Sequence, residues 1–107
     1  CAKTIPTDKN KYTNTKKNIE SIAVCSGSGG SFFNDIAEQE ISVYITSDVR
    51  HDVWIEAINK DIALFDCGHF STETIVLDYI QKVLSANVPC IEFIIADSNK
   101  DNINYIC

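Results

Sequence analysis

Apolar and polar positions alternate in blocks from Ile19 onward, and each block has the length of a strand or a helix. Short apolar runs predict strands at residues 21–25, 42–46, 62–67 and 90–96. The segments between these runs repeat apolar residues at helical spacing, which predicts helices at 32–39, 49–59 and 72–87. Strands that alternate with helices are typical of α/β proteins, so we expect a mostly parallel or mixed sheet flanked by helices.

Polar residues stand where two of these helices should begin. Ser47 or Asp48 precedes the helix at 49–59, and Ser71 or Thr72 precedes the helix at 72–87, so each is a candidate N-cap. The last helix carries an apolar stripe, made of Ile75, Leu77, Ile80, Val83 and Leu84. The stripe predicts that this helix packs one side on the sheet.

Length and composition restrict the class of protein. A chain of 107 residues allows one domain, and 45% apolar residues are enough for a hydrophobic core. No apolar run reaches the ~20 residues of a membrane span, and no signal peptide opens the chain. Its five cysteines form no C-x-x-C pair, which favours a reducing compartment. We therefore expect a soluble cytoplasmic domain with no membrane partner.

Charge divides the chain into two parts. Residues 1–17 hold five Lys and one Asp, a net charge of +4. Because the whole chain has a net charge of −6, residues 18–107 carry −10. The basic, polar segment 1–17 is predicted to be a lead-in or linker, and 18–107 a single α/β domain. An acidic domain repels phosphate backbones, so nucleic acid is not an expected partner.

Glycines fill the first connection from strand to helix, residues 26–31. Such a turn can simply bring strand and helix together, or it can direct backbone amides towards an anion or substrate. The second interpretation makes candidates of Gly27, Ser28, Gly29 and Gly30. Nucleotide binding with Asp48 on a ribose is a further alternative, but Phe32 stands where the dinucleotide motif has its third glycine.

Ionisable residues gather in the other two connections. Asp48 and Asp52 flank His51, whose pKa nearby carboxylates would raise, so His51 is a candidate acid or base and helix capping is the alternative. In the third connection, His69 and Glu73 are four residues apart and would share one side of a helix. An imidazole and a carboxylate so placed can bind one divalent cation. With fifteen acidic residues in the chain, that spacing alone is common.

Read together, the three connections resemble a known family. The blocks are AVCSGSGGS at 23–31, YITSDVRH at 44–51 and DCGHFSTE at 66–73. They are similar, in order and spacing, to signature blocks in the C-terminal half of the Ngg1-interacting factor 3-like family, whose members are also called GTP cyclohydrolase type 2 homologues. The resemblance implies two related α/β lobes, a homohexamer, and two divalent metal ions between the lobes.

Carried over to this chain, the resemblance implies that His69 and Glu73 are metal ligands, with Glu73 bridging the two ions. It places the remaining ligands in an N-terminal half that this chain does not contain, and it makes His51 a residue that lines the cleft. A His and Glu pair suits Zn, Fe and Mn alike.

Two functions follow as hypotheses. The first is the C-terminal lobe of a dinuclear, hydrolase-like metalloprotein that takes a small anionic or nucleotide-like substrate; no catalytic residue is assigned, and the chain alone is expected to be inactive. The alternative is a non-catalytic module for oligomerisation or protein interaction. Under either hypothesis a homo-oligomer is expected.

Overall fold

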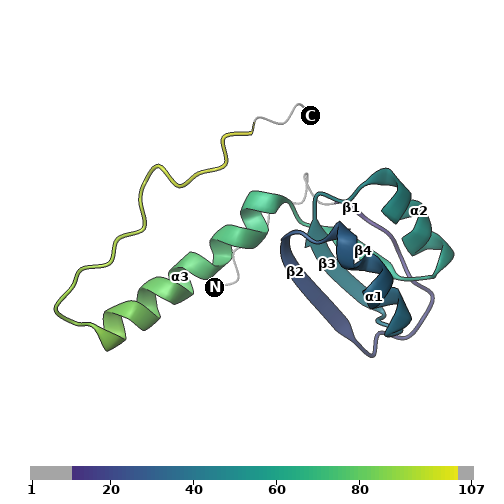
Figure 1. Ribbon diagram of the computed structural model, residues 1–107, viewed down its shortest axis with the longest axis horizontal. Coiled ribbons are helices and arrows are strands. Elements are labelled where there is room, and N and C mark those ends of the chain that lie inside the picture. Colours follow the sequence, from purple (N-terminus) through teal and green to yellow (C-terminus); the bar gives the residue numbers. More distant parts are fainter. Residues whose placement is uncertain (1–10, 104–107) are drawn as a thin grey trace.

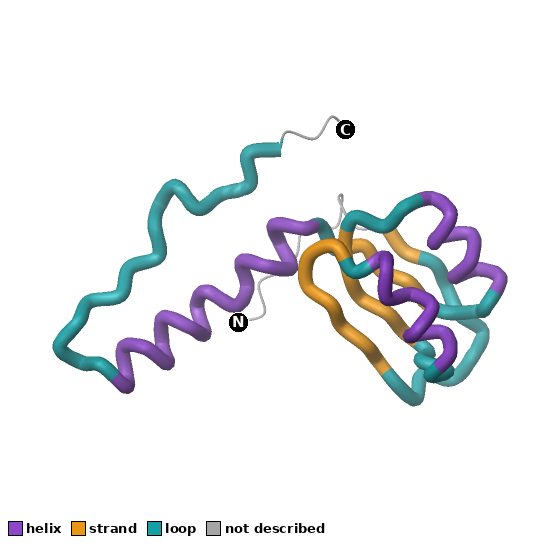
Figure 2. The backbone as a smooth tube through the Cα atoms, viewed as in Figure 1, coloured by secondary structure: helices purple, strands orange, loops and turns teal. Residues whose placement is uncertain are grey.

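The computed structural model describes residues 11–103, shown in Figures 1 and 2. The first half of the described chain comprises β1 (Lys11–Tyr12), β2 (Ile22–Ser28), the short 3₁₀ helix η2 (Gly30–Phe32) and α1 (Phe33–Glu38). The second half comprises β3 (Val43–Ser47), α2 (His51–Asn59), β4 (Ala63–Asp66) and α3 (His69–Asn87). The first three predicted strands and all three predicted helices are confirmed to within a few residues.

The strands form one mixed sheet in the order β1-β4-β3-β2. β2, β3 and β4 are parallel, and β1 pairs antiparallel with β4. The predicted fold class, an α/β fold with a mixed sheet, is thus confirmed. Because the parallel strands follow one another across the sheet in chain order, right-handed crossovers place α1 and α2 on the same face.

A small hydrophobic core lies between that face of the sheet and the two short helices. Partly buried side chains of α1 and α2, such as Ile36 and Trp54, pack against it. The buried cluster itself consists of Phe33, Tyr44, Ala57, Ile62 and Leu64. Core residues thus come from both helices, from β3, and from β4 with the residue before it.

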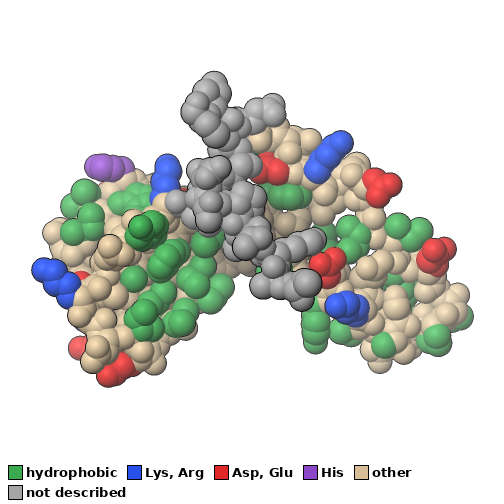
Figure 3. All heavy atoms as spheres, turned by 180° about the vertical axis from the view of Figure 1, so that it is seen from behind, with side chains coloured by type: hydrophobic (Ala, Val, Ile, Leu, Met, Phe, Trp, Pro, Cys, Tyr) green, Lys and Arg blue, Asp and Glu red, His purple; other side chains and the backbone are tan. Residues whose placement is uncertain are grey.

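The opposite face of the sheet is largely uncovered. Tyr12, Ile22 and Val24 are each more than half exposed. The register places Val24, Ile45 and Phe65 in one row across β2, β3 and β4, and the ring of Tyr12 stacks on that of Phe65 with centroids 5.8 Å apart. Figure 3 shows hydrophobic side chains gathered over the part of the molecule that holds the sheet.

The helix α3 does not cover this face. Figure 1 shows α3 beginning at the sheet and projecting away from it. None of its residues is buried, and Ile75 of the predicted stripe is 73% exposed. The prediction that the stripe packs on the sheet is therefore wrong. The direction of the helix decides this, because only its N-terminal turns stay close to β2 and β3.

The segment 90–96, predicted to be a strand, has no strand structure. It runs back beside α3, where the Gln81 side-chain amide donates to the carbonyl oxygen of Phe93 at 2.7 Å. Phe93 and Ile95 line a groove together with Leu77, Ile80 and Leu84 of α3. Because α3 leads the chain away from the sheet, these β-prone residues pack on the helix instead of pairing with a strand.

The predicted lead-in differs from the structure over residues 11–16. Lys11 and Tyr12 pair with β4, the amide of Thr13 donates to the carbonyl oxygen of Leu64 at 2.9 Å, and the amide of Lys16 donates to Asp61 at 2.9 Å. Backbone pairing at a sheet edge needs no apolar side chains, so the polar composition gave no sign of it. Residues 1–10 of the predicted lead-in lie outside the described residues.

The predicted N-caps are wrong as well. α2 begins after Arg50 and α3 after Gly68, and neither helix has a side-chain hydrogen bond at its cap. The residues expected to cap the helices bond elsewhere. The hydroxyl of Ser47 donates to the carbonyl oxygen of Gly27 at 2.6 Å, and Asp48 contacts His69.

No helix among residues 11–103 is long and apolar enough to cross a lipid bilayer.

The end of β2 is irregular and depends on hydroxyl groups from β3. Its register against β3 shifts between Val24 and Ser28. The amide of Gly29 donates to Thr46 Oγ1 at 2.9 Å, and the Tyr44 hydroxyl donates to the Gly29 carbonyl oxygen at 2.7 Å. Burial raises the pKa of Tyr44, so the hydroxyl keeps its proton for this bond.

Gly29→Ala should destabilise the protein by roughly 1–3 kcal/mol, the cost of overpacking a well-filled interior. A Cβ at this position would overlap Thr46 Oγ1 and the Tyr44 hydroxyl and would lie 2.9 Å from Cys25 Cβ. Gly30→Ala is the matched control, because a Cβ there has no atom within 4 Å. Urea unfolding followed by Trp54 fluorescence measures both variants. Equal stability of the two would contradict this account of the turn.

Candidate metal centre

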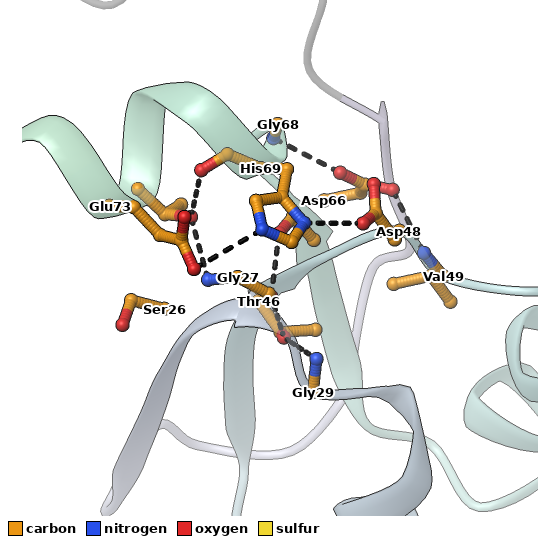
Figure 4. Close-up of polar contacts among 12 residues, drawn as sticks. Ser26, Gly27, Gly29, Thr46, Asp48, Val49, Asp66, Gly68, His69 and Glu73 are labelled. Atoms are coloured by element: carbon orange, nitrogen blue, oxygen red, sulfur yellow. Dashed lines mark hydrogen bonds and ion pairs between the residues drawn. The ribbon is translucent and has the colours of Figure 1, made fainter.

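Three connections meet at the carboxyl ends of the parallel strands, as Figure 4 shows. β2 ends in the glycine turn, β3 is followed by Asp48, and β4 is followed by Gly68 and the first turn of α3. His69 is the first residue of α3, and Glu73 lies one turn later. The fold thus gathers one imidazole and two carboxylates from two connections.

His69 contacts a carboxylate through each ring nitrogen. Nδ1 lies 2.6 Å from Asp48 Oδ2, and Nε2 lies 3.2 Å from Glu73 Oε1. The hydrogen bond with Asp48 is the main reason why the pKa of His69 is raised above its ordinary 6.5, and the nearby charge of Glu73 adds to it. Without a bound cation, the imidazole is therefore held between two acceptors.

Gly27 leaves room beside the two donor atoms that face it. A Cβ at this position would lie 2.6 Å from Glu73 Oε1 and 3.4 Å from His69 Nε2. The backbone of Gly27 has φ +68°, in the left-handed region that favours glycine, and its amide donates to Thr72 Oγ1 at 2.9 Å. The glycine therefore brings the turn of β2 against α3 without filling the space at the site.

Asp66, at the end of β4, ties the other two connections together. Its Oδ2 accepts a hydrogen bond from the amide of Val49 at 3.1 Å, and its Oδ1 accepts one from the amide of Gly68 at 3.1 Å. Val49 follows Asp48, and Gly68 precedes His69. A single half-buried carboxylate thus sets the relative position of the two connections that carry the site.

The donor pair fits a divalent cation. With bonds near 2.1 Å, two ligands of a tetrahedral ion lie about 3.4 Å apart, close to the 3.2 Å between His69 Nε2 and Glu73 Oε1. Among residues 11–103, however, no group of three or more His, Cys, Asp and Glu side chains is arranged to hold a metal ion. A metal-ligand role of His69 and Glu73 therefore stays a prediction, and further donors would be needed to complete such a site.

The other predicted site residues have different surroundings. His51 is exposed at the start of α2, and its described contacts include neither His69 nor Glu73. The amides of Gly27 and Gly29 already donate to the hydroxyls of Thr72 and Thr46. Anion binding stays a prediction for these residues, among which Ser28 is exposed. The ribose contact of Asp48 stays a prediction as well, and one of its carboxylate oxygens contacts His69.

Sequence reasoning missed the residues that hold the site in place. Thr46, Asp66 and Thr72 make the hydrogen bonds that fix the three connections. One signal was available: Thr46 and Asp66 are polar residues that end apolar strands, where a side chain needs a partner to become buried.

The chain matches the model of a protein family over nearly its whole length. That family is Duf34/NIF3 (NGG1p interacting factor 3), and the match covers residues 2–102. The chain belongs to the Duf34/NIF3 family. The resemblance of the three sequence blocks is thereby confirmed. Two of those blocks supply Asp48, His69 and Glu73, so the site lies within the part of the chain that the family shares.

Relatives of known name are much longer than this chain. The GTP cyclohydrolase 1 type 2 homolog of Nostoc sp. is 32% identical over 84 residues, which are 78% of this chain and 30% of that protein. NIF3-like protein 1 of Rattus norvegicus is 27% identical over 89 residues, which are 82% of this chain and 23% of that protein. The chain thus spans less than a third of the length of these Duf34/NIF3 relatives.

Solved structures share the fold. Staphylococcus aureus protein SA1388 superposes with a TM-score of 0.78 over 95% of this chain and 30% of that chain, at 23% identity. Reduced HcgD from Methanocaldococcus jannaschii superposes with a TM-score of 0.56 over 63% of this chain and 27% of that chain, at 33% identity. The similarity to SA1388 covers most of the chain, so the fold described above is a recurring one.

The pKa of His69 should fall in Asp48→Asn, because the substitution removes the nearest negative charge. NMR titration of the His69 ring protons measures it, and Asp52→Asn is the control, because Asp52 pairs with Arg50 instead. Since folding raises the pKa of His69, the contact stabilises the fold fully below about pH 6.5 and is lost as the pH rises through the folded-state value. An unchanged His69 pKa in Asp48→Asn would refute the assigned cause.

Proposed function

We propose that this domain is one lobe of a metal-dependent, hydrolase-like protein and that it supplies His69 and Glu73 as ligands. One observation carries the proposal: Nε2 of His69 and Oε1 of Glu73 lie 3.2 Å apart beside a glycine whose missing side chain leaves space at both atoms. The names of the relatives, GTP cyclohydrolase 1 type 2 homolog among them, support a hydrolytic function of the longer protein.

Two ligands hold a cation weakly, so a complete centre needs donors from elsewhere. We propose two divalent ions, of Zn, Fe or Mn, in the longer protein, which His69 and Glu73 would help to hold. When bound, such ions polarise a phosphate or carbonyl oxygen and lower the pKa of a bound water. In this chain, His69 and Glu73 bind the cation, Asp48 faces the other ring nitrogen, and the exposed Ser28 and His51 are available to a small anionic or nucleotide-like substrate.

The chain should bind Zn²⁺ measurably but weakly, and binding should depend on both ligands. His69→Ala and Glu73→Gln should each lower the affinity at least tenfold, or about 1.4 kcal/mol, in calorimetric titration. His51→Ala is the control, since the described contacts of His51 include neither ligand.

The GTP cyclohydrolase 1 type 2 homolog of Nostoc sp. offers a test of the second lobe. Its full-length form should bind Zn²⁺ far more tightly than the segment of it that matches this chain. Equal affinity of those two proteins would refute a centre completed by a second lobe.

Gly27→Ala should abolish Zn²⁺ binding by this chain, because its Cβ would lie 2.6 Å from Glu73 Oε1. Gly68→Ala is a closely matched control. Gly68 also has a positive φ, +78°, but its Cβ would meet only Ser71 Oγ, at 3.8 Å. Titrations of both folded variants therefore separate loss of space at the site from loss of stability. Equal Zn²⁺ affinity of the two variants would count against the assigned position of the ion.

The second candidate function is a module for oligomerisation or protein interaction. The uncovered face of the sheet and the exposed stripe of α3 favour it, since large exposed apolar patches mark interaction surfaces. Under this function, which includes assembly into a cytoplasmic homohexamer, His69→Ala and Glu73→Gln leave the assembly intact. Light scattering of the variants used for Zn²⁺ titration thus separates the two functions.

A further inference from the structure

On the basis of the metal-binding function above, we propose that Asp48 is the positioning residue of His69. Its carboxylate keeps the proton of the neutral imidazole on Nδ1, so that the lone pair of Nε2 faces the space beside Gly27 and Glu73. The juxtaposition that points to this role is the 2.6 Å contact between Asp48 Oδ2 and His69 Nδ1, on the ring nitrogen that faces away from Glu73.

The backbone of Asp48 is unusual and is not explained by a helix end. Asp48 has φ +53°, in the left-handed region. Glu40 and Asp61 are the other residues besides glycine with positive φ in the described chain, and both follow the last turn of a helix, where this conformation is common. Asp48 follows a strand instead. The side chain of Asp48 does not cap α2 either. It contacts the imidazole of His69 instead.

Hydrogen bonds between side chains and the backbone fix the residues around the contact. Asp66 accepts from the amides of Val49 and Gly68, which are the neighbours of Asp48 and His69 in the chain. Thr72, in the first turn of α3, accepts from the amide of Gly27 and donates to the carbonyl oxygen of His69 at 2.9 Å. The sequence positions on both sides of the contact are thus anchored independently of the imidazole.

The chemistry of the two carboxylates decides the tautomer. An ionised carboxylate can only accept a hydrogen bond, so Asp48 and Glu73 compete for the single proton of neutral His69. The contact of Asp48 at Nδ1 is 2.6 Å, whereas the contact of Glu73 at Nε2 is 3.2 Å. The shorter contact favours the tautomer in which Nδ1 carries the proton. A histidine that donates through one nitrogen presents the other as a ligand, in a fixed ring orientation.

Two substitutions at Asp48 separate position from charge. Asp48→Gly removes the acceptor, and glycine adopts the same backbone conformation without cost. Asp48→Asn keeps an acceptor oxygen, tolerates positive φ and removes only the charge. Glu40→Gly is the control, because Glu40 is exposed and has φ +55°. It makes the same exchange of a carboxylate for glycine, but at the opposite end of β3 from Asp48.

Nitrogen-15 NMR of the metal-free protein, above the pH at which His69 loses its proton, reports the tautomer. We expect Nδ1–H in the wild type, in Asp48→Asn and in Glu40→Gly, and a shift towards Nε2–H in Asp48→Gly. Calorimetry with Zn²⁺ should show an affinity loss of about 10–100-fold in Asp48→Gly, as for other partners of metal-binding histidines. Asp48→Asn should retain most of the affinity.

Distinct results would overturn the positioning role and the metal function. An unchanged tautomer in Asp48→Gly overturns the positioning role, and so does an Asp48→Asn variant that binds Zn²⁺ as weakly as Asp48→Gly, because charge alone would then explain the loss. A wild-type chain that binds no Zn²⁺ overturns the metal function. In that case a tautomer shift in Asp48→Gly still supports the hold of Asp48 on His69.

Discussion

A cluster of buried hydroxyl groups at the end of β3 holds the glycine turn in place, and the site depends on it. Where β2 breaks register, its backbone groups stay buried but lose their strand partners. The hydroxyls of Tyr44, Thr46 and Ser47 bond to the backbone of Gly27 and Gly29 in their stead. Gly29 permits this close approach because any larger residue would overlap the hydroxyls.

The hydroxyl cluster and the carboxylate of Asp66 join different pairs of connections. The hydroxyls attach the turn of β2 to β3, and Asp66 attaches the loop after β3 to the loop after β4. Thr72 joins α3 to the turn of β2, because its hydroxyl accepts a hydrogen bond from the amide of Gly27. The side chains of Asp48, His69 and Glu73 are exposed. Buried and partly buried hydrogen bonds thus position groups that are accessible to solvent.

The sequence predicted the parts of the fold that depend on local pattern. Periodic apolar residues located the strands and helices up to Asn87. The blocks around Gly27, Asp48 and His69 contain residues that the fold brings together at the candidate site. It failed where long-range geometry decides. The apolar run at 90–96 has the composition of a strand, but α3 carries it away from the sheet. Thr46 and Asp66 stand out in the sequence only as polar residues near strand ends, because their hydrogen-bond partners lie in other connections that fold against them.

The two proposed ligands lie one turn apart on a single helix of nineteen residues. The backbone hydrogen bonds of that turn, and not the rest of the sheet, fix how His69 and Glu73 are spaced. Displacing or tilting α3 would therefore move both donor atoms together and leave their separation nearly unchanged. It would instead alter their distance from Asp48 and Gly27, which belong to other elements. The proposed ligand pair is thus a preformed bidentate unit, and its alignment with the sheet depends on the hydrogen bonds of Thr72 and Asp66.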